Sequence, residues 1–278
     1  MMKFGIIGYP LTTTLSPVIY QKAFEICSLR AEYFVYPFED ISSFKEIVLK
    51  EGLQGFNVTI PHKRTALNLI DDMDVDTTNM GCINTVKVDN GKLYATNTDW
   101  LGFLSALNAE NIELADINAI VLGTGGSAVA SCYALAYAKA KTISIISRRQ
   151  EEALKIKLLL NKSFKDISVN CYDFSNGAYL QTCGLFVNCT PIGMYAEDSL
   201  GIAKLLKYLP KNCFLFDLCY CNDSLPTYFI HVAKDLKIRC CDGLSMLVRQ
   251  AAVSFNFWTE LDFDIDDMLF YLRRKLCA

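Results

Sequence analysis

The chain has 278 residues, of which 52% are hydrophobic and 21% are charged, and its formal net charge is −3. This composition is typical of a folded globular protein with one large domain or two ordinary ones, and it excludes a disordered chain. The slightly acidic balance argues against a large basic surface for nucleic acid. The first apolar run is too short for a signal peptide, and no stretch reaches the ~18 apolar residues of a membrane span, so we expect a cytoplasmic protein.

The cysteines do not predict a metal site or a disulfide scaffold. There are 12 of them, but they form no C-x-x-C pair, and only two histidines accompany them. A zinc site and a Ser-His-Asp hydrolase both need more imidazole than this chain offers. A chain of this length with no export signal also has no need of disulfides. We interpret the cysteines as small buried hydrophobic residues.

Apolar β-rich runs alternate with runs of helical periodicity along the chain, which is typical of an α/β fold with a largely parallel sheet. Strands are expected at 3–8, 32–37, 55–60, 82–88, 92–96, 117–122, 142–147, 168–172, 184–188, 213–218 and 237–241. Helices are expected at about 17–28, 42–51, 62–70, 99–110, 126–138, 150–161, 225–235 and 245–260.

Hydroxyl side chains gather before the first expected helix. Ser16 is placed as its N-cap and Pro17 as its first helical residue, and Thr12, Thr13 and Thr14 precede them. The plain interpretation of Ser16 is a helix cap. Several hydroxyls at a helix N-terminus also suit a carboxylate ligand.

The stretch FNVTIPHKR at 56–64 places three basic residues where a helix is expected to begin. Phe56, Val58 and Ile60 have the pattern of a buried strand, and Pro61 suits the first helical position. The positive end of the helix dipole disfavours a cation such as Lys63. A residue that opposes local stability in this way is either a functional group or a solvated surface lysine, and the segment alone leaves both open.

A hairpin follows. The sequence Asp89-Asn90-Gly91-Lys92 predicts a type I′ turn, which would place Asn84 opposite Asn97 at the open end of the hairpin. Asp99 lies just beyond, where the chain enters its next helix. Three polar side chains are therefore expected together at this point.

The second half opens with a strand, a glycine loop and a helix. Gly123, Gly125 and Ala128 form G-x-G-x-x-A in this context, which is the dinucleotide-binding fingerprint. The first glycine allows the tight turn, the second lets the backbone approach a pyrophosphate, and the alanine permits close packing of helix on strand. The flanking strand and helix make an ordinary glycine turn the weaker interpretation.

The end of the next strand bears on cofactor choice. NAD enzymes place an acidic residue there to bind the ribose 2′-hydroxyl, whereas this chain has Ser147, Arg148 and Arg149. Arginine matches a 2′-phosphate in charge and in forked geometry, so we expect NADP(H). The alternative is that these arginines only solvate a strand end.

Taken together, the motifs resemble those of the shikimate dehydrogenase family over nearly the whole chain. They are G-x-P-x-x-x-x-x-S-P at 8–17, NVTIPHK at 57–63, INT at 83–85, NTDWLGF at 97–103, GTGGSA at 123–128, the Ser147-Arg148 pair, NCTPIGM at 188–194, DLCY at 217–220 and GLSMLVRQAA at 243–252. Any one of them could occur by chance, but their order and spacing are specific.

The resemblance implies roles for individual residues. Lys63 and Asp99 would be the catalytic pair. Ring hydroxyls of the substrate would be bound by Thr59, Asn84 and Gln250, and its carboxylate by Thr14, Ser16 and Tyr220. The residues that would bind the cofactor are Gly123, Gly125, Gly126, Ser127, Ala128, Ser147, Arg148, Arg149, Thr190 and Gly243.

The family usually has serine where this chain has Thr14, so the chain keeps the hydroxyl and adds a methyl group. We expect that methyl group to exclude the additional hydroxyl of quinate. A quinate/shikimate dehydrogenase using NAD or NADP stays open as an alternative, as does a non-catalytic NADPH-binding regulator on the same fold. Retention of both Lys63 and Asp99 argues against the regulator.

The expected architecture is a two-domain α/β protein with a cleft between the domains. Residues 1–102 plus 243–278 would form the substrate-binding and catalytic domain, and residues 103–242 a Rossmann NADP-binding domain. We expect a small-molecule substrate (shikimate or 3-dehydroshikimate), no nucleic acid, no membrane and no metal, in a monomer or homodimer.

Overall fold

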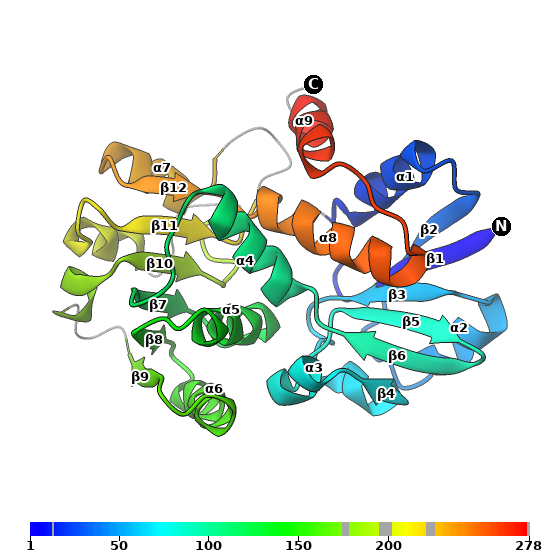
Figure 1. Cartoon of the computed structure of the whole chain (residues 1–278), viewed down its shortest axis with the longest axis horizontal. Coiled ribbons are helices and arrows are strands. Elements are labelled where there is room, and N and C mark those ends of the chain that lie inside the picture. The colour runs from blue at the N-terminus through cyan, green and yellow to red at the C-terminus, as the bar shows by residue number, and fades with distance from the viewer. Residues whose placement is uncertain (13, 174–177, 195–201, 221–225, 277–278) are drawn as a thin grey trace. The chain divides into compact units, whose positions relative to one another are not determined.

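The computed structural model describes residues 1–12, 14–173, 178–194, 202–220 and 226–276 (Figure 1). Thr13, one of the three threonines expected before the first helix, lies outside the described residues. The described chain divides into two compact units, Met1–Gly102 with Leu247–Leu276 and Phe103–Met246. Each unit has its own six-stranded sheet. The later division falls inside a helix, a few residues beyond the expected start of the returning segment at Gly243.

The first unit is built on a mixed sheet with the strand order β2-β1-β3-β5-β6-β4. Only β5 runs antiparallel to its neighbours β3 and β6. The strands are β1 (Met2–Ile7), β2 (Ala31–Tyr36), β3 (Gly55–Val58), β4 (Asp72–Met73), β5 (Thr85–Asp89) and β6 (Lys92–Thr96). The helices of this unit are α1 (Ser16–Ile26), α2 (Phe44–Glu51), α3 (Val75–Met80), the start of α4 (Asp99–Ala109), most of α8 (Leu244–Thr259) and α9 (Ile265–Leu276).

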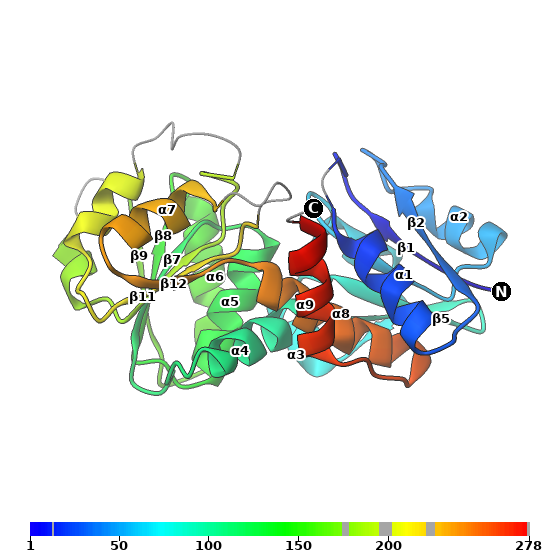
Figure 2. The same cartoon turned by 90° about the horizontal axis from the view of Figure 1, so that it is seen from above.

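The sheet of the first unit is covered on both faces. One face carries a cluster that includes Phe44, Val48 and Phe56 under α2. On the other face Trp258 of α8 stacks on Phe4 with ring centroids 5.0 Å apart, and α1 lies beside α9 (Figure 2). Burial of these large side chains stabilises each layer by roughly 1.5–3 kcal/mol per side chain.

The second unit has a parallel sheet in the order β12-β11-β10-β7-β8-β9. Its strands are β7 (Asn118–Leu122), β8 (Thr142–Ile146), β9 (Ser168–Tyr172), β10 (Leu185–Asn188), β11 (Phe214–Asp217) and β12 (Arg239–Cys241). Its further helices are α5 (Gly126–Tyr137), α6 (Gln150–Ser163), α7 (Tyr228–Asp235) and the 3₁₀ helices Ala178–Thr182 and Ile202–Tyr208. This is the doubly wound dinucleotide-binding order, in which the strand order reverses between β7 and β10.

The two faces of this parallel sheet are both apolar. Phe186 and Leu215 point to the face covered by Phe229 of α7. Phe216 points the opposite way and stacks on Phe103 of α4, with centroids 5.4 Å apart. A sheet buried on both faces explains why its strands read as continuous apolar runs rather than as alternating ones.

The expected helix at 62–70 is wrong. Residues 61–64 form turns, and only Thr65–Leu69 continue as a 3₁₀ helix before Ile70 becomes extended. The reason is a long-range hydrogen bond: the Lys63 carbonyl accepts the N–H of Ile83 at 2.8 Å, so it does not accept a helical N–H from its own segment. Lys63 therefore lies in the turn before a short 3₁₀ helix and not in the first turn of the expected helix, so the dipole argument for its role no longer applies as stated.

Among the described residues, five elements were not expected from the sequence: β4, α3, α9 and the 3₁₀ helices Ala178–Thr182 and Ile202–Tyr208. The short α3 has local signals that could have predicted it. Asp74 caps it by accepting the N–H of Thr77 at 2.7 Å, and Gly81 ends it with a φ of 61°. The hairpin prediction is confirmed, because Asn90 and Gly91 both have positive φ and Asp89 pairs with Lys92.

Candidate functional site

The first unit contains an ion pair between Lys63 and Asp99. Lys63 lies in the turn after β3, and Asp99 is the first residue of α4. The Lys63 Nζ donates to Asp99 Oδ2, and the two side chains are only 11% and 7% exposed. A cation and a carboxylate held together away from bulk water can transfer a proton to or from a ligand hydroxyl group.

Asn84 holds the other oxygen of the Asp99 carboxylate. The Asn84 Oδ1 accepts the backbone N–H of Thr98 at 2.7 Å, which fixes the orientation of the amide because an N–H can only donate. The Nδ2 is then turned toward Asp99 Oδ1 at 2.9 Å. Asp99 is thus oriented from both sides, with Lys63 on one oxygen and Asn84 on the other.

Gln250 joins the same group of side chains from α8. Its Oε1 lies 3.1 Å from Asn84 Nδ2, and its Nε2 donates to the Leu247 carbonyl at 2.8 Å. Gly102 of α4 allows this approach, since a Cβ there would lie 2.7 Å from the Cβ of Gln250. Gln250 is therefore held among polar partners at the point where α8 and α4 approach each other closely.

Beneath these residues lies a cluster of buried hydroxyls that sequence reasoning missed. Thr85, Thr98 and Ser254 are all 0% exposed. The Ser254 Oγ lies 2.7 Å from Thr85 Oγ1 and 3.0 Å from Thr98 Oγ1, and it donates to the Gln250 carbonyl at 3.0 Å. A signal existed, because Ser254 follows Gln250 by one helical turn and Thr98 precedes Asp99. The cluster supports the side chains above it.

Two stacked tyrosines border this cluster. The rings of Tyr20 and Tyr33 lie 4.5 Å apart, and the Tyr33 hydroxyl donates to Asn57 Oδ1 at 2.6 Å. The Tyr20 hydroxyl is buried near Asn57 and Ser254, it has no hydrogen bond of good geometry within the described part of the chain, and burial raises its pKa. Both phenols therefore stay protonated and neutral beside the ion pair.

Thr14, Ser16 and Thr59 lie on segments that follow the carboxyl ends of two neighbouring strands. Thr14 and Ser16 follow β1, Thr59 follows β3, and these strands are parallel neighbours. The Ser16 N–H donates to Thr14 Oγ1 at 3.3 Å. The expected N-cap is one residue off, because Leu15 occupies that position and Ser16 is the first helical residue. The Thr14 hydroxyl therefore stabilises the entry to α1 instead.

In the second unit, the glycine loop has the conformation that the fingerprint requires. Gly123 has a φ of 113°, a region that side chains disfavour. Among the described residues, and apart from the glycine and its two chain neighbours, no atom lies within 4 Å of the position that a Cβ of Gly125 would take, so the backbone there is open to a ligand. Gly126 and Ser127 begin α5, and Ala128 is fully buried against the sheet. The loop can therefore place the first turn of α5 against a phosphate.

The arginines lie beside this loop because β7 and β8 are neighbours. Arg148 is exposed at the end of β8. The Arg149 N–H donates to Ser147 Oγ at 3.0 Å, and its Nη2 donates to Thr124 Oγ1 at 3.3 Å. Sequence reasoning gave no role to Thr124, which occupies the first variable position of the fingerprint. Two guanidinium groups next to a phosphate loop provide cationic donors for a second phosphate.

Three further candidates of the second unit follow β10, β11 and β12. Thr190 packs on the loop, since a Cβ at Gly123 would lie 2.9 Å from its Cγ2. Tyr220 lies three residues beyond the end of β11 and is partly buried. At Gly243 a Cβ would lie 2.1 Å from the Leu218 carbonyl oxygen, so only glycine fits. Because this contact is with backbone, a larger residue would displace the segment that leads to Tyr220.

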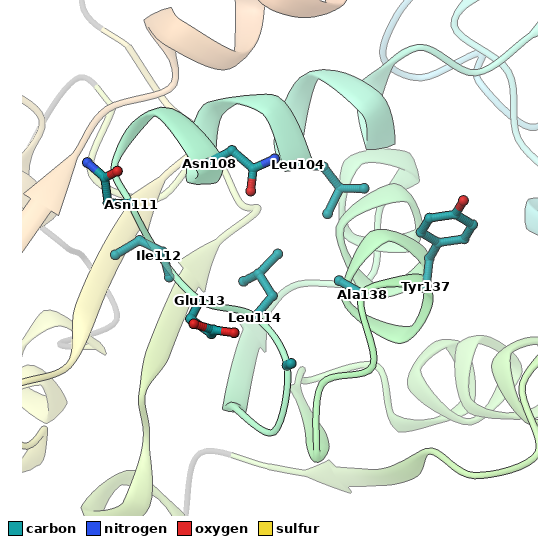
Figure 3. Close-up of a pocket in the computed structure, with 9 residues that line it drawn as sticks. Leu104, Asn108, Asn111, Ile112, Glu113, Leu114, Tyr137 and Ala138 are labelled. Carbon is teal, nitrogen blue, oxygen red and sulfur yellow. The ribbon is translucent and has the colours of Figure 1, made fainter.

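One pocket of about 580 Å³ lies in the second unit, and none of the candidate residues lines it. Leu104 and Asn108 of α4, Ile112 and Leu114 of the following loop and Tyr137 of α5 border it (Figure 3). Across the described ranges, no three His, Cys, Asp or Glu side chains come close enough together to hold a metal ion. None of the helices in that part of the chain is long and apolar enough to cross a membrane.

Comparison with known proteins connects both ends of the chain to one family. Residues 6–86 match the shikimate dehydrogenase substrate binding domain, and residues 243–269 match the shikimate 5′-dehydrogenase C-terminal domain. The shikimate dehydrogenase (NADP(+)) of Alkaliphilus oremlandii is 33% identical over 279 residues, covering 98% of this chain and 95% of the relative. The chain belongs to the shikimate dehydrogenase family.

Solved shikimate dehydrogenases share the whole fold. A shikimate dehydrogenase in complex with NADP⁺ superposes with a TM-score of 0.89 at 29% identity, covering 100% of this chain and 96% of the other. The Thermus thermophilus enzyme in complex with NADP(H) and shikimate gives 0.84 at 29% identity, covering 99% and 100%. The family resemblance and the two-domain α/β fold with a Rossmann-type unit, both expected from the sequence, are confirmed.

Proposed function

We infer that this shikimate dehydrogenase family member catalyses the reversible NADPH-dependent reduction of 3-dehydroshikimate to shikimate, in the biosynthesis of aromatic amino acids through chorismate. The observation that carries the mechanism is the Lys63–Asp99 ion pair, which Asn84 orients and which is largely shielded from water. A regulator that only bound NADPH would have no use for a shielded proton donor of this kind.

The residues of the second unit fit NADP(H). The open backbone at Gly125 and the first turn of α5 suit the pyrophosphate, because helix N-termini attract anions. Arg148 and Arg149 suit the 2′-phosphate, and no carboxylate stands in the sequence at 147–149 to favour NAD. We propose that Ser127, Ser147, Thr190 and Gly243 complete this site, as the motifs of the family imply.

When bound in this site, NADPH would supply the hydride that the carbonyl carbon of the substrate accepts. Lys63 donates a proton to the oxygen that becomes the new hydroxyl, so the carbonyl gains one hydride and one proton. Asp99 keeps the ammonium in place by accepting its hydrogen bond. In the reverse direction the same lysine accepts the hydroxyl proton.

The substrate contacts are proposed from the same positions. Thr59, Asn84 and Gln250 would bind ring hydroxyls, and Thr14, Ser16 and Tyr220 would bind the carboxylate. The support for the first set is local: Asn84 and Gln250 are joined to each other and to Asp99. In the described part of the chain, one amide hydrogen of Gln250 is committed to Leu247, which leaves the second for a ligand.

Initial rates test the function directly. The purified chain is assayed for NADP⁺ reduction with shikimate, then with quinate, and both acids are repeated with NAD⁺. We expect a strong preference for shikimate and NADP⁺. Equal kcat/KM for the two acids would indicate a quinate/shikimate dehydrogenase, and absence of turnover with intact NADPH binding would indicate a regulator.

We further propose that the enzyme acts in the cytoplasm as a monomer or homodimer, with no nucleic-acid or membrane partner. The net charge of −3 and the lack of a long run of like charge support this.

A further inference from the structure

A buried carboxylate at the end of β11 has no role in the chemistry described so far. Asp217 is 0% exposed, and among the described residues its carboxylate accepts hydrogen bonds from Thr227, Asn188 and Cys219. Its Oδ2 accepts the Thr227 hydroxyl at 2.5 Å. Its Oδ1 accepts the Asn188 Nδ2 at 2.8 Å and the Cys219 N–H at 3.1 Å. A buried carboxylate without a cation needs such donors, and its strength as an acceptor dictates how they are oriented.

Asn188 is the side chain that connects Asp217 to Thr190. An ionised carboxylate only accepts hydrogen bonds, so the amide nitrogen of Asn188 must face Asp217. Its oxygen then faces Thr190, and it accepts both the backbone N–H at 3.0 Å and the hydroxyl at 2.7 Å. If the amide turned over, its nitrogen would meet the donors of Thr190. The Ile192 carbonyl accepts the same Asn188 Nδ2 at 3.3 Å, so it favours this orientation as well. Asp217, at the shorter distance of 2.8 Å, anchors the amide whose oxygen accepts the Thr190 hydroxyl.

Thr190 is held on its other sides as well. Its carbonyl accepts the Cys219 S–H at 3.1 Å, and its Oγ1 accepts the Ile192 N–H at 3.3 Å. Its methyl group packs against the backbone of Gly123, the first residue of the phosphate loop. A shift of Thr190 would therefore move the surface against which that loop rests.

We propose that Asp217 is a positioning residue for NADPH, acting through Asn188 to fix Thr190 against the glycine loop. The same carboxylate oxygen also holds the amide of Cys219, which directly precedes Tyr220, so one buried group supports two segments at the carboxyl edge of the sheet. The inference rests on the proposed NADPH site, to which it adds a residue that touches neither the cofactor nor the substrate.

The hydrogen bond from Thr227 provides a matched control. Thr227 caps α7, where its hydroxyl also accepts the N–H of Ile230 at 3.3 Å. It bonds the Asp217 oxygen that does not contact Asn188. Thr227→Val therefore removes a hydrogen bond from the same carboxylate while the route to Thr190 stays intact.

The test is a double-mutant cycle on NADPH affinity, read from NADPH fluorescence without substrate, with the unfolding midpoint measured in parallel. We expect Asp217→Asn to raise the NADPH Kd by about tenfold, which corresponds to about 1.4 kcal/mol. Thr190→Val should raise it by a similar factor. The double variant should be little weaker than either single variant, because both remove one linked arrangement. Thr227→Val should lower the unfolding midpoint with the Kd changed less than about twofold, which is within the spread expected for uncoupled sites.

Additive effects of Asp217→Asn and Thr190→Val would overturn the proposal, as would an unchanged Kd in Thr190→Val. If Asp217→Asn does not fold, Asn188→Ala replaces it in the cycle with the same expectation. Turnover of the wild-type chain with shikimate and NADP⁺ is measured separately, so failure of the proposed function would be distinguished from failure of this inference.

Discussion

Replacement of Lys63 by methionine is the sharpest test of the catalytic pair, because it removes the charge and keeps much of the side-chain volume. Asp99 would retain Asn84 on one oxygen and lose its only partner on the other among the described residues. Removing one member of a buried ion pair costs about 3–5 kcal/mol. Because the Lys63 side chain is 11% exposed, we expect the low end, about 3 kcal/mol, which a typical domain tolerates.

The effect on turnover should be much larger than the effect on folding. Loss of one general acid lowers kcat by roughly 10²–10⁴-fold. The NADPH Kd should stay unchanged, since the glycine loop belongs to the other unit. We would measure kcat for shikimate oxidation, NADPH fluorescence and urea unfolding on the same preparation.

The first unit offers a matched control in the exposed pair of Lys45 and Asp71, whose Nζ–Oδ2 distance is 2.9 Å and whose side chains are 34% and 36% exposed. Lys45→Met should cost less than about 1 kcal/mol and leave kcat unchanged. The double variant Lys63→Met/Asp99→Asn should regain stability relative to Lys63→Met, because no unpaired charge stays buried, while kcat stays low. A folded Lys63→Met enzyme with kcat within a factor of ten of wild type would refute the reasoning.

Other predictions concern cofactor choice, substrate choice and pH. Arg148→Ala should weaken NADPH binding by roughly tenfold to a hundredfold and barely affect NADH, the usual effect of losing a charged hydrogen bond; a wild-type preference for NADH would contradict this. Thr14→Val should raise the KM for shikimate, and Thr14→Ser should keep shikimate activity and admit more quinate, within the roughly 1–3 kcal/mol that one such group discriminates; an unaffected Thr14→Val enzyme would remove the residue from the site. Burial raises the pKa of Asp217 from its ordinary 3.8 to about 6, so the folded chain binds its proton more readily and this group's contribution to the unfolding free energy should grow as pH falls from 6 to 4. The gain reaches about 3 kcal/mol at most, and Asp217→Asn should abolish it. Urea unfolding at pH 6 and at pH 4 measures the unfolding free energy of both proteins. An equal change in unfolding free energy between the two pH values would show that Asp217 does not titrate in this range.

Sequence patterns predicted the parts of this molecule that local geometry determines. Asn90 and Gly91 both need positive φ, and Gly123 needs a tight turn, so the residue types alone indicated the hairpin and the phosphate loop. The helix prediction for the segment after β3 was wrong because a long-range contact determines the structure there. The carbonyl of Lys63 is bonded to Ile83, a residue far along the chain, and no periodicity in the segment itself reports that contact.

Some residues of the candidate site could likewise be predicted from the sequence, and others could not. Lys63 and Asp99 could be singled out, but the orientation of Asn84 depends on the Thr98 N–H and could be found only from coordinates. Asp217 belongs to the DLCY motif, but no sequence pattern indicates its role, because its importance lies in donors from separate segments of the chain. Burial and convergence of this kind are tertiary properties.

The division of the chain into a discontinuous and a continuous unit has a consequence for synthesis on the ribosome. All of Phe103–Met246 emerges as one uninterrupted segment and can fold as soon as it is complete. The first unit must wait for Leu247–Leu276, since Trp258 covers its sheet by stacking on Phe4 and donating to the Val86 carbonyl at 2.9 Å. The segment made first is therefore the last to become native, and its apolar face needs protection for most of translation.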